Sequence, residues 1–156
     1  MSKILIKGAN VVNEGQTALL DVLIEGERIA AIAANMSPTP DMEVIDASGK
    51  FLLPGCIDDQ VHFREPGLTH KATIGTESKA CLAGGITSFL EMPNTNPQTT
   101  TAQAYNHKLD VAARTSWVNY GFLFGGTNDN LEEIKAINPK PTPGLKLFLG
   151  YSTGNM

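Results

Sequence analysis

The stretch of sequence that bears most strongly on the fold is Pro54-Gly55-Cys56-Ile57-Asp58-Asp59-Gln60-Val61-His62-Phe63-Arg64-Glu65-Pro66-Gly67. Its first two residues are typical of a boundary turn, and residues 56–63 are predicted to form a β-strand. Side chains alternate between the two faces of a strand, so this strand separates into an apolar and a polar face. The apolar set is Ile57, Val61 and Phe63, and the polar set is Asp58, Gln60, His62 and Arg64.

Strands and helices are predicted to alternate after this point. The predicted strands cover residues 56–63, 86–92, 117–124 and 145–149, and the predicted helices begin near Thr73, in the capping-box pattern of residues 100–103, and at Asn130 with Glu133. Such alternation indicates a parallel sheet, either a closed barrel or an open doubly wound sheet. Four strands are half of an eight-stranded barrel, which typically needs about 250 residues. We therefore expect an α/β chain, and if its sheet is a (β/α)₈ barrel, the chain contains only the first half of it.

Residues 1–54 have the pattern of a small all-β unit. Residues 19–25 and 28–33 flank Glu25-Gly26-Glu27, which is a hairpin signal. Further short strands are predicted at residues 3–6, 11–12, 43–46 and 51–53, with a turn at residues 8–10. The predicted domains are therefore residues 1–54 and residues 55–156.

Composition excludes several classes of function. The 156 residues have a formal net charge of -4 and no basic cluster, which argues against nucleic-acid binding. No apolar run is long enough to span a membrane, and the N-terminal residues do not form a signal peptide. The two cysteines, Cys56 and Cys81, are interpreted as structural thiols. We expect a soluble cytoplasmic protein.

The polar face of the first strand after residue 55 could carry chemistry. Polar side chains inside a barrel are costly unless something pairs with them, and a metal or an anionic ligand would do so. Active sites of such barrels lie at the C-terminal ends of the strands. The alternative is an edge strand whose polar face is solvated.

Two further segments hold candidate site residues. Lys146 lies within the predicted strand 145–149, where burial would favour its neutral, reactive amine; the alternative is an exposed lysine on an edge strand. Asn94 follows the strand 86–92, where an amide could bind a polar ligand, although Asn and Pro are also ordinary loop formers.

Together these segments resemble the dihydroorotases of the amidohydrolase superfamily. The resemblance rests on Pro-Gly-x-Ile-Asp-x-x-Val-His-Phe-Arg-Glu-Pro-Gly at residues 54–67, Ala-Gly-Gly-Ile-Thr at 83–87, Met-Pro-Asn-Thr at 92–95 and Leu-Lys-Leu-Phe at 145–148. Hydantoinases, dihydropyrimidinases and allantoinases share this frame, but the Phe-Arg-Glu-Pro-Gly ending favours dihydroorotase. The resemblance implies a metal-dependent hydrolase barrel with a small β-sandwich domain, to which residues 1–54 contribute the N-terminal part.

The resemblance also implies a reaction and roles for single residues. Family dihydroorotases reversibly hydrolyse the cyclic amide of L-dihydroorotate to N-carbamoyl-L-aspartate in pyrimidine biosynthesis, with one or two zinc ions. His62 matches a metal-binding histidine, and Lys146 matches a lysine that many relatives carbamylate to bridge two metals. Arg64 and Asn94 match residues that hold the substrate carboxylate, a task that suits the bidentate guanidinium.

Gln60 is a departure from the family pattern, because it replaces the first histidine of a His-x-His pair. An amide oxygen is a poorer zinc ligand than an imidazole. The site would then hold one metal, hold two with the first bound weakly, or belong to a non-catalytic homologue. Asp58 or Asp59 could supply a carboxylate instead, and strand alternation favours Asp58.

The other functional groups of the family are not found in this sequence. Besides His62, the histidines are His70, in the loop after the first barrel strand, and His107, which is predicted to be solvated. Two histidine ligands and the general acid/base Asp would lie beyond residue 156, so we expect a fragment, a truncated product or part of a split assembly that is inactive alone. Unpaired sheet edges and exposed apolar faces predict a homodimer or another partner.

Three functions remain open at this point. The first is a dihydroorotase acting on a small-molecule substrate. The second is a non-catalytic dihydroorotase-like subunit that supports aspartate transcarbamoylase, which Gln60 favours. The third is a hydantoinase-, dihydropyrimidinase- or allantoinase-like cyclic amidase, which Arg64 and Asn94 disfavour.

Overall fold

The computed structural model describes residues 2–152, and the chain divides into two compact units, Met1–Pro54 and Gly55–Met156. No helix in the described residues is long and apolar enough to cross a membrane.

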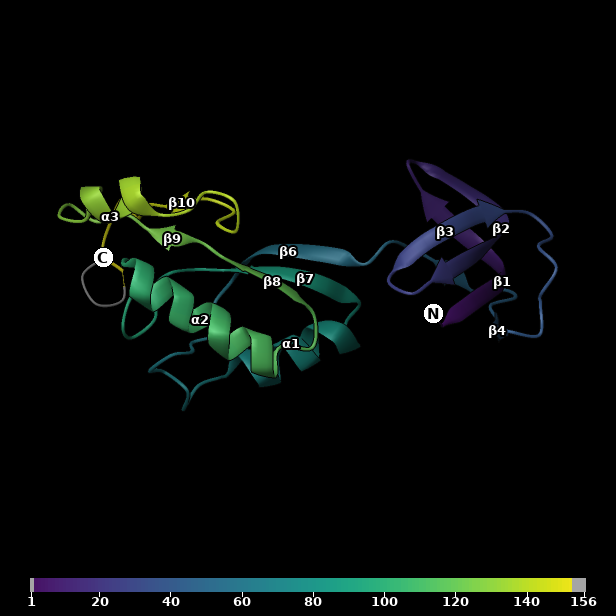
Figure 1. Cartoon of the computed structure of the whole chain (residues 1–156), viewed down its shortest axis with the longest axis horizontal. Coiled ribbons are helices and arrows are strands. Elements are labelled where there is room, and N and C mark those ends of the chain that lie inside the picture. The colour runs from purple at the N-terminus through teal and green to yellow at the C-terminus, as the bar shows by residue number, and fades with distance from the viewer. Residues whose placement is uncertain (1, 153–156) are drawn as a thin grey trace. The chain divides into compact units, whose positions relative to one another are not determined.

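The first unit is a five-stranded sheet (Figure 1). Its strands are β1 (Lys3–Asn13), β2 (Gln16–Glu25), β3 (Arg28–Ala33), β4 (Met42–Asp46) and β5 (Phe51–Leu52). The order is β3-β2-β1-β4, with β5 also paired to β1. The β2–β3 hairpin is antiparallel, whereas β4 and β5 run parallel to β1. Residues Ala9, Val11, Val22 and Ala47 form its buried core.

The turn predicted at residues 8–10 is wrong, because β1 continues through it. The pairing of β1 with β2 shifts register between Ile6 and Ala9, as at a β-bulge. Gly8 has a φ of 68°, which glycine adopts without steric cost, and its N–H donates to Asp21 Oδ1 at 2.7 Å. Glycine therefore bends this strand without ending it.

The second unit alternates strands and helices. Its strands are β6 (Cys56–Val61), β7 (Ile86–Glu91), β8 (Asn119–Phe122), β9 (Phe124–Gly125) and β10 (Leu145–Lys146). Its helices are α1 (Ile74–Ala83), α2 (Ala102–Thr115) and α3 (Leu131–Ala136). The strands β6-β7-β8 form a parallel sheet, and β9, one residue beyond β8, pairs in parallel with β10. The strand predicted over residues 145–149 is thus paired only at its first two residues.

Helix starts follow local side-chain chemistry only in part. The Thr73 hydroxyl caps α1 and forms a capping box with Thr76. Helix α2 begins one residue later than the predicted box, because Thr101 is its N-cap and accepts from Ala104 N at 3.2 Å. Asn130 does not cap α3 with its side chain; instead its amide donates to the carbonyl oxygens of Thr100 and Gly125 at 2.9 Å. Helix α3 therefore starts after Asn130 as predicted, but the Asn130 side chain connects two loops instead of capping the helix.

The core of the second unit lies between the sheet and its helices. Helices α1 and α2 pack against each other and cover one face of the β6-β7-β8 sheet (Figure 1). Phe89 is fully buried there, with its ring centroid 4.5 Å from that of Phe63 and 6.3 Å from that of Phe122. Tilted and edge-on aromatic pairs of this kind add to the stabilisation from apolar burial.

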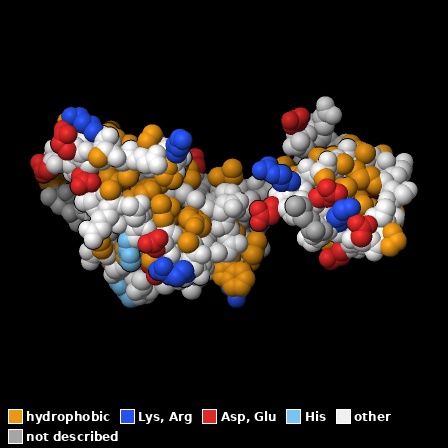
Figure 2. Space-filling model, viewed as in Figure 1, with side chains coloured by type: hydrophobic (Ala, Val, Ile, Leu, Met, Phe, Trp, Pro, Cys, Tyr) orange, Lys and Arg blue, Asp and Glu red, His pale blue; other side chains and the backbone are white. Residues whose placement is uncertain are grey.

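Apolar side chains are also exposed on both units (Figure 2). Examples are Ile29 and Phe51 in the first unit and Leu147 and Leu149 in the second. Within residues 2–152, β6 and β10 each pair with one neighbour only, so each leaves one edge unpaired. The described residues of the second unit therefore do not form a closed barrel.

Candidate active site

The candidate residues lie at the C-terminal ends of neighbouring parallel strands. His62 directly follows β6, and Asn94 comes three residues after β7. Hydrogen bonds extend the ladder into these loops, since Met92 N donates to Val61 O and Leu123 N donates to Glu91 O, both at 3.0 Å. The ends of β6, β7 and β8 therefore meet at one edge of the sheet.

His62 and Lys146 both belong to the side of the second unit that faces away from the helix-covered core. Val61 is buried in the core beneath the helices, so the next side chain, His62, belongs to the opposite face. Phe124 is buried in that same core, and the following residue of β9, Gly125, is the register partner of Lys146. The Lys146 ammonium lies 5.2 Å from the centre of the Phe148 ring.

The expectation for Asp58 is wrong, because β6 is irregular. The partner of Asp58 is Phe89 and that of Val61 is Glu91, so three steps along β6 match two along β7. Asp58 therefore shares the helix-covered face with Phe89, and its Oδ1 accepts from Gln60 N at 3.1 Å. Its negative charge contributes to raising the pKa of Cys81 on α1, after burial of that thiol. Asp58 does not share the face of His62, so it does not replace the missing histidine.

The side chain of Asn94 orients His62. Asn94 is buried, and its Oδ1 lies 2.9 Å from His62 Nδ1. Its Nδ2 donates to Ser152 Oγ at 3.4 Å. An amide oxygen can only accept, so Nδ1 carries the imidazole proton and Nε2 keeps its lone pair. Metal-binding histidines are commonly held in this way by a partner on the second ring nitrogen.

The surroundings of His62 favour the neutral imidazole. Burial lowers its pKa most, and the positive charges of Arg64, Lys146 and Lys108 lower it further, whereas the hydrogen bond that Nδ1 donates to Asn94 raises it. A neutral imidazole is the form that binds a metal.

Arg64 lies in a loop that is interlocked with the loop bearing Asn94. Arg64 has a φ of 67°, which is uncommon for a residue with a side chain, and its carbonyl accepts from Leu68 N at 3.0 Å. Asn96 N donates to Pro66 O at 3.2 Å, and Gly67 packs so tightly on Asn96 that a Cβ there would overlap its carbonyl oxygen. Gln60, in contrast, is exposed on β6.

A buried ion pair lies beneath the site, and the sequence motifs do not predict it. Glu91 Oε2 lies 2.8 Å from Lys108 Nζ, and both side chains are almost fully buried. Lys108 lies on the buried stripe of α2, between Tyr105 and Ala112. Lys108 lies three residues after Tyr105 and four before Ala112, and this helical spacing is the sequence signal that predicts a buried lysine. Glu91 Oε2 makes no aligned hydrogen bond within the described chain, so the contact is an ion pair.

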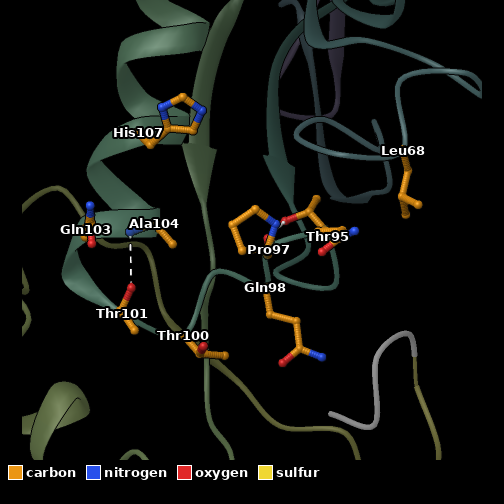
Figure 3. Close-up of a pocket in the computed structure, with 10 residues that line it drawn as sticks. Leu68, Thr95, Pro97, Gln98, Thr100, Thr101, Gln103, Ala104 and His107 are labelled. Carbon is orange, nitrogen blue, oxygen red and sulfur yellow. Dashed lines mark hydrogen bonds between the residues drawn. The ribbon is translucent and has the colours of Figure 1, made fainter.

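One pocket lies next to the candidate residues but is not lined by them. It has a volume of about 790 Å³ and is formed between Thr95–Thr101 and α2 (Figure 3). His107 lines it and is exposed, as predicted, whereas His62, Arg64 and Lys146 are not among the lining residues. His70 is also exposed, in the turn before α1. We therefore do not place the reaction in this pocket.

Residues 2–152 contain no group of three His, Cys, Asp or Glu side chains that could hold a metal ion. The face of His62 offers its Nε2, with Lys146 on the same face and Gln60 two residues before it. This donor set fits a metal only in part, and further ligands would have to come from elsewhere.

The chain is similar to a known protein family and to individual relatives within it. Residues 49–140 match a family model described as dihydro-orotase-like. An allantoinase from Desulfitobacterium hafniense is 37% identical over 150 residues, which are 96% of this chain and 33% of the relative. A dihydroorotase from Carboxydothermus hydrogenoformans is 52% identical over 95 residues, 60% of this chain and 22% of the relative.

The fold is similar to that of solved hydantoinases. An L-hydantoinase (dihydropyrimidinase) from Arthrobacter aurescens matches with a TM-score of 0.93 and 31% identity, covering 100% of this chain and 35% of that one. The expected fold, the N-terminal portion of such a barrel with a β-rich unit before it, is confirmed. The chain spans about a third of the length of the curated relatives it matches.

Proposed function

The chain belongs to the dihydro-orotase-like family of cyclic amidohydrolases, and from this premise we propose that the whole protein hydrolyses the cyclic amide of L-dihydroorotate. The proposal is supported by the contact of His62 with Asn94 and by the backbone hydrogen bond between the loops that carry Arg64 and Asn94. A metal-binding imidazole and a guanidinium on one loop suit a cyclic amide that also carries a carboxylate.

The residues of this chain have separate roles in the proposed reaction. His62 would hold the metal through Nε2, because Asn94 occupies Nδ1. Arg64 would bind the substrate carboxylate, and Asn94 would share that task from the neighbouring loop. Lys146, unmodified or carbamylated, would reach the same face from β10, with Gln60 as a weak additional ligand. One or two zinc ions would supply the Lewis acidity that activates water toward the ring carbonyl.

A substrate comparison on the whole protein tests the proposal. We expect zinc-loaded protein to hydrolyse L-dihydroorotate with a higher kcat/KM than allantoin or an uncharged hydantoin. Arg64→Met should reduce kcat/KM for dihydroorotate by about tenfold or more, because a charge-assisted bidentate contact contributes about 1.5–3 kcal/mol. Higher activity of the unaltered protein on the uncharged ring would contradict the proposal.

A second candidate is a cyclic amidase that acts on an uncharged ring. The match to the L-hydantoinase over the whole chain favours it. In that case Arg64→Met would leave kcat/KM for hydantoin nearly unchanged. The same substrate comparison therefore separates the two candidates.

We also propose how the whole protein assembles and where it is located. A homodimer and association with aspartate transcarbamoylase are consistent with the exposed apolar side chains and unpaired strand edges. The exposed Gln60 favours the non-catalytic form of such a subunit, which zinc-free, inactive protein that copurifies with the transcarbamoylase would support. We propose a cytoplasmic location, and the 156 residues alone should be inactive; turnover of dihydroorotate by this purified chain would contradict that.

A further inference from the structure

The buried ion pair of Glu91 and Lys108 contacts both loops of the candidate site. Glu91 Oε1 accepts from Phe63 N at 3.2 Å, and Phe63 lies between His62 and Arg64. Lys108 Nζ donates to Met92 O at 3.2 Å, two residues before Asn94. One end of the pair therefore holds the loop after β6, and the other holds the loop after β7.

Stability alone is a weak reason for this pair. Burying two opposite charges removes their hydration, and apolar residues of similar volume often stabilise a core equally well or better. The Lys108 ammonium also lies 4.9 Å from the centre of the ring of Phe122, a residue of the buried core. An apolar replacement would leave the Phe63 N–H and the Met92 carbonyl without these partners.

The loop that Glu91 holds is conformationally demanding. Arg64 has a positive φ of 67°, a conformation that persists only where neighbouring contacts impose it. The hydrogen bond from Phe63 N fixes the peptide that joins His62 to Phe63, one residue before Arg64. His62, on the other side of Phe63, must meet Asn94 Oδ1 at 2.9 Å. A small shift at Phe63 would therefore move both side chains.

We propose that Glu91 and Lys108 are positioning residues, which hold His62 and Arg64 on one loop in register with Asn94 on the other. They act through the backbone at Phe63 and Met92 and do not touch the substrate. This inference rests on the proposed function for its effect on catalysis, but the placement of the loops can be measured without turnover.

Two charge-free double variants of the whole protein separate positioning from packing. Glu91→Gln with Lys108→Met keeps an oxygen that can accept from Phe63 N, whereas Glu91→Leu with Lys108→Met removes it at similar volume. We expect kcat of the Leu variant to be about tenfold or more below that of the Gln variant, the size of effect typical of residues that orient metal ligands. Equal kcat values in the two variants would overturn the proposal.

A control variant distinguishes positioning from loss of stability. Ala112→Gly weakens α2 one turn beyond Lys108 without touching Glu91. We expect it to lower the thermal midpoint while kcat of the folded protein stays at the unaltered level. If kcat of the Leu variant falls only in proportion to unfolded protein, the role is structural and the proposal fails. Should the Leu variant not fold, Glu91→Met in the same background supplies a second variant without the acceptor.

Hydrogen exchange supplies the readout that needs no activity. In the Leu variant, amide exchange in a peptide covering residues 61–66 should accelerate about tenfold or more over the Gln variant, the counterpart of losing one backbone hydrogen bond of about 1.5 kcal/mol. A peptide from residues 18–24 of the other unit should be unchanged. If every substrate fails but this difference appears, the proposed function is wrong and the positioning holds. If both peptides change alike, or neither does, the positioning is refuted.

Discussion

Gly67→Ala tests whether the interlocking of the two loops matters for the site. Gly67 has a φ of 81°, and an added Cβ would overlap the carbonyl oxygen of Asn96 and lie 2.7 Å from its carbonyl carbon. Ordinary contacts of a Cβ begin near 3.4 Å. Most of the obstacle is backbone, so the loop bearing Asn94 would have to move away from the loop bearing Arg64.

The expected cost has two parts. A left-handed conformation costs an alanine about 1–2 kcal/mol, and overpacking typically costs about 1–3 kcal/mol more. Gly85→Ala is the matched control, because Gly85 has a φ of 83° but nothing within 4 Å of an added Cβ. Gly85→Ala should lose only the stability that the left-handed conformation costs. The difference in unfolding free energy between the two variants therefore gives the cost of the contact with Asn96.

Activity should separate the two variants more strongly than stability. A displacement of about 1 Å in a binding group can lower a rate by about 100-fold. We therefore expect kcat/KM for dihydroorotate to fall by about that factor in Gly67→Ala and to change little in Gly85→Ala, measured on protein that thermal denaturation shows to be folded. Equal losses of stability and activity in the two variants would refute the reasoning.

Three further predictions concern the metal site, the ion pair and the core. Gln60→His should raise zinc affinity about tenfold or more, because imidazole is a better zinc ligand than an amide; unchanged affinity in a zinc titration would show that residue 60 does not reach the metal. Lys108→Met should cost about 3–5 kcal/mol near neutral pH by leaving the Glu91 carboxylate unpaired. Burial raises the pKa of Glu91 in the folded state, so the folded variant favours the protonated carboxyl. The variant's loss of unfolding free energy relative to unaltered protein should therefore grow as pH rises through that raised pKa. Urea denaturation that gives the same loss at acidic and neutral pH would contradict this. Phe89→Ala should lower the free energy of unfolding by about 3–5 kcal/mol, because it is a large-to-small change in a fully buried site. Leu145→Ala is the comparison, at a half-exposed site. If Phe89→Ala loses less unfolding free energy than Leu145→Ala, the described core is wrong.

Much of the fold could be predicted because local pattern and packing agree. The apolar positions Val61 and Phe63 face the helices, and the cap at Thr73 starts α1 as its sequence suggests. The limits of β3 also match the prediction. In these places hydrophobic alternation or capping chemistry coincides with the contacts made in the fold.

The failures arise where one residue breaks the regular period. Strand alternation assigned Asp58 to the face of His62, but one additional residue in β6 moves it to the other face. The sequence around Gly8 predicts a turn, although a glycine with positive φ also permits a bulge within a continuous strand. Neither outcome is visible in a periodic pattern, because both depend on the register with a neighbouring strand.

The candidate site could be predicted in its residue types but not in its connections. His62, Asn94 and Lys146 follow from the motifs and from the position of strand ends. The contact of Asn94 with His62 and the ion pair of Glu91 with Lys108 join residues that are distant in sequence. The first contact depends on loop conformation and the second on how α2 packs against β7, and the motifs encode neither.

A crystal structure of the zinc-loaded whole protein tests the central claim most directly. The account predicts electron density for zinc on the face shared by His62 and Lys146, with His62 Nε2 about 2.0–2.1 Å from the ion and Nδ1 still bonded to Asn94. Zinc bound elsewhere, or His62 turned away from the ion while Lys146 lies on the opposite face of the sheet, would contradict it.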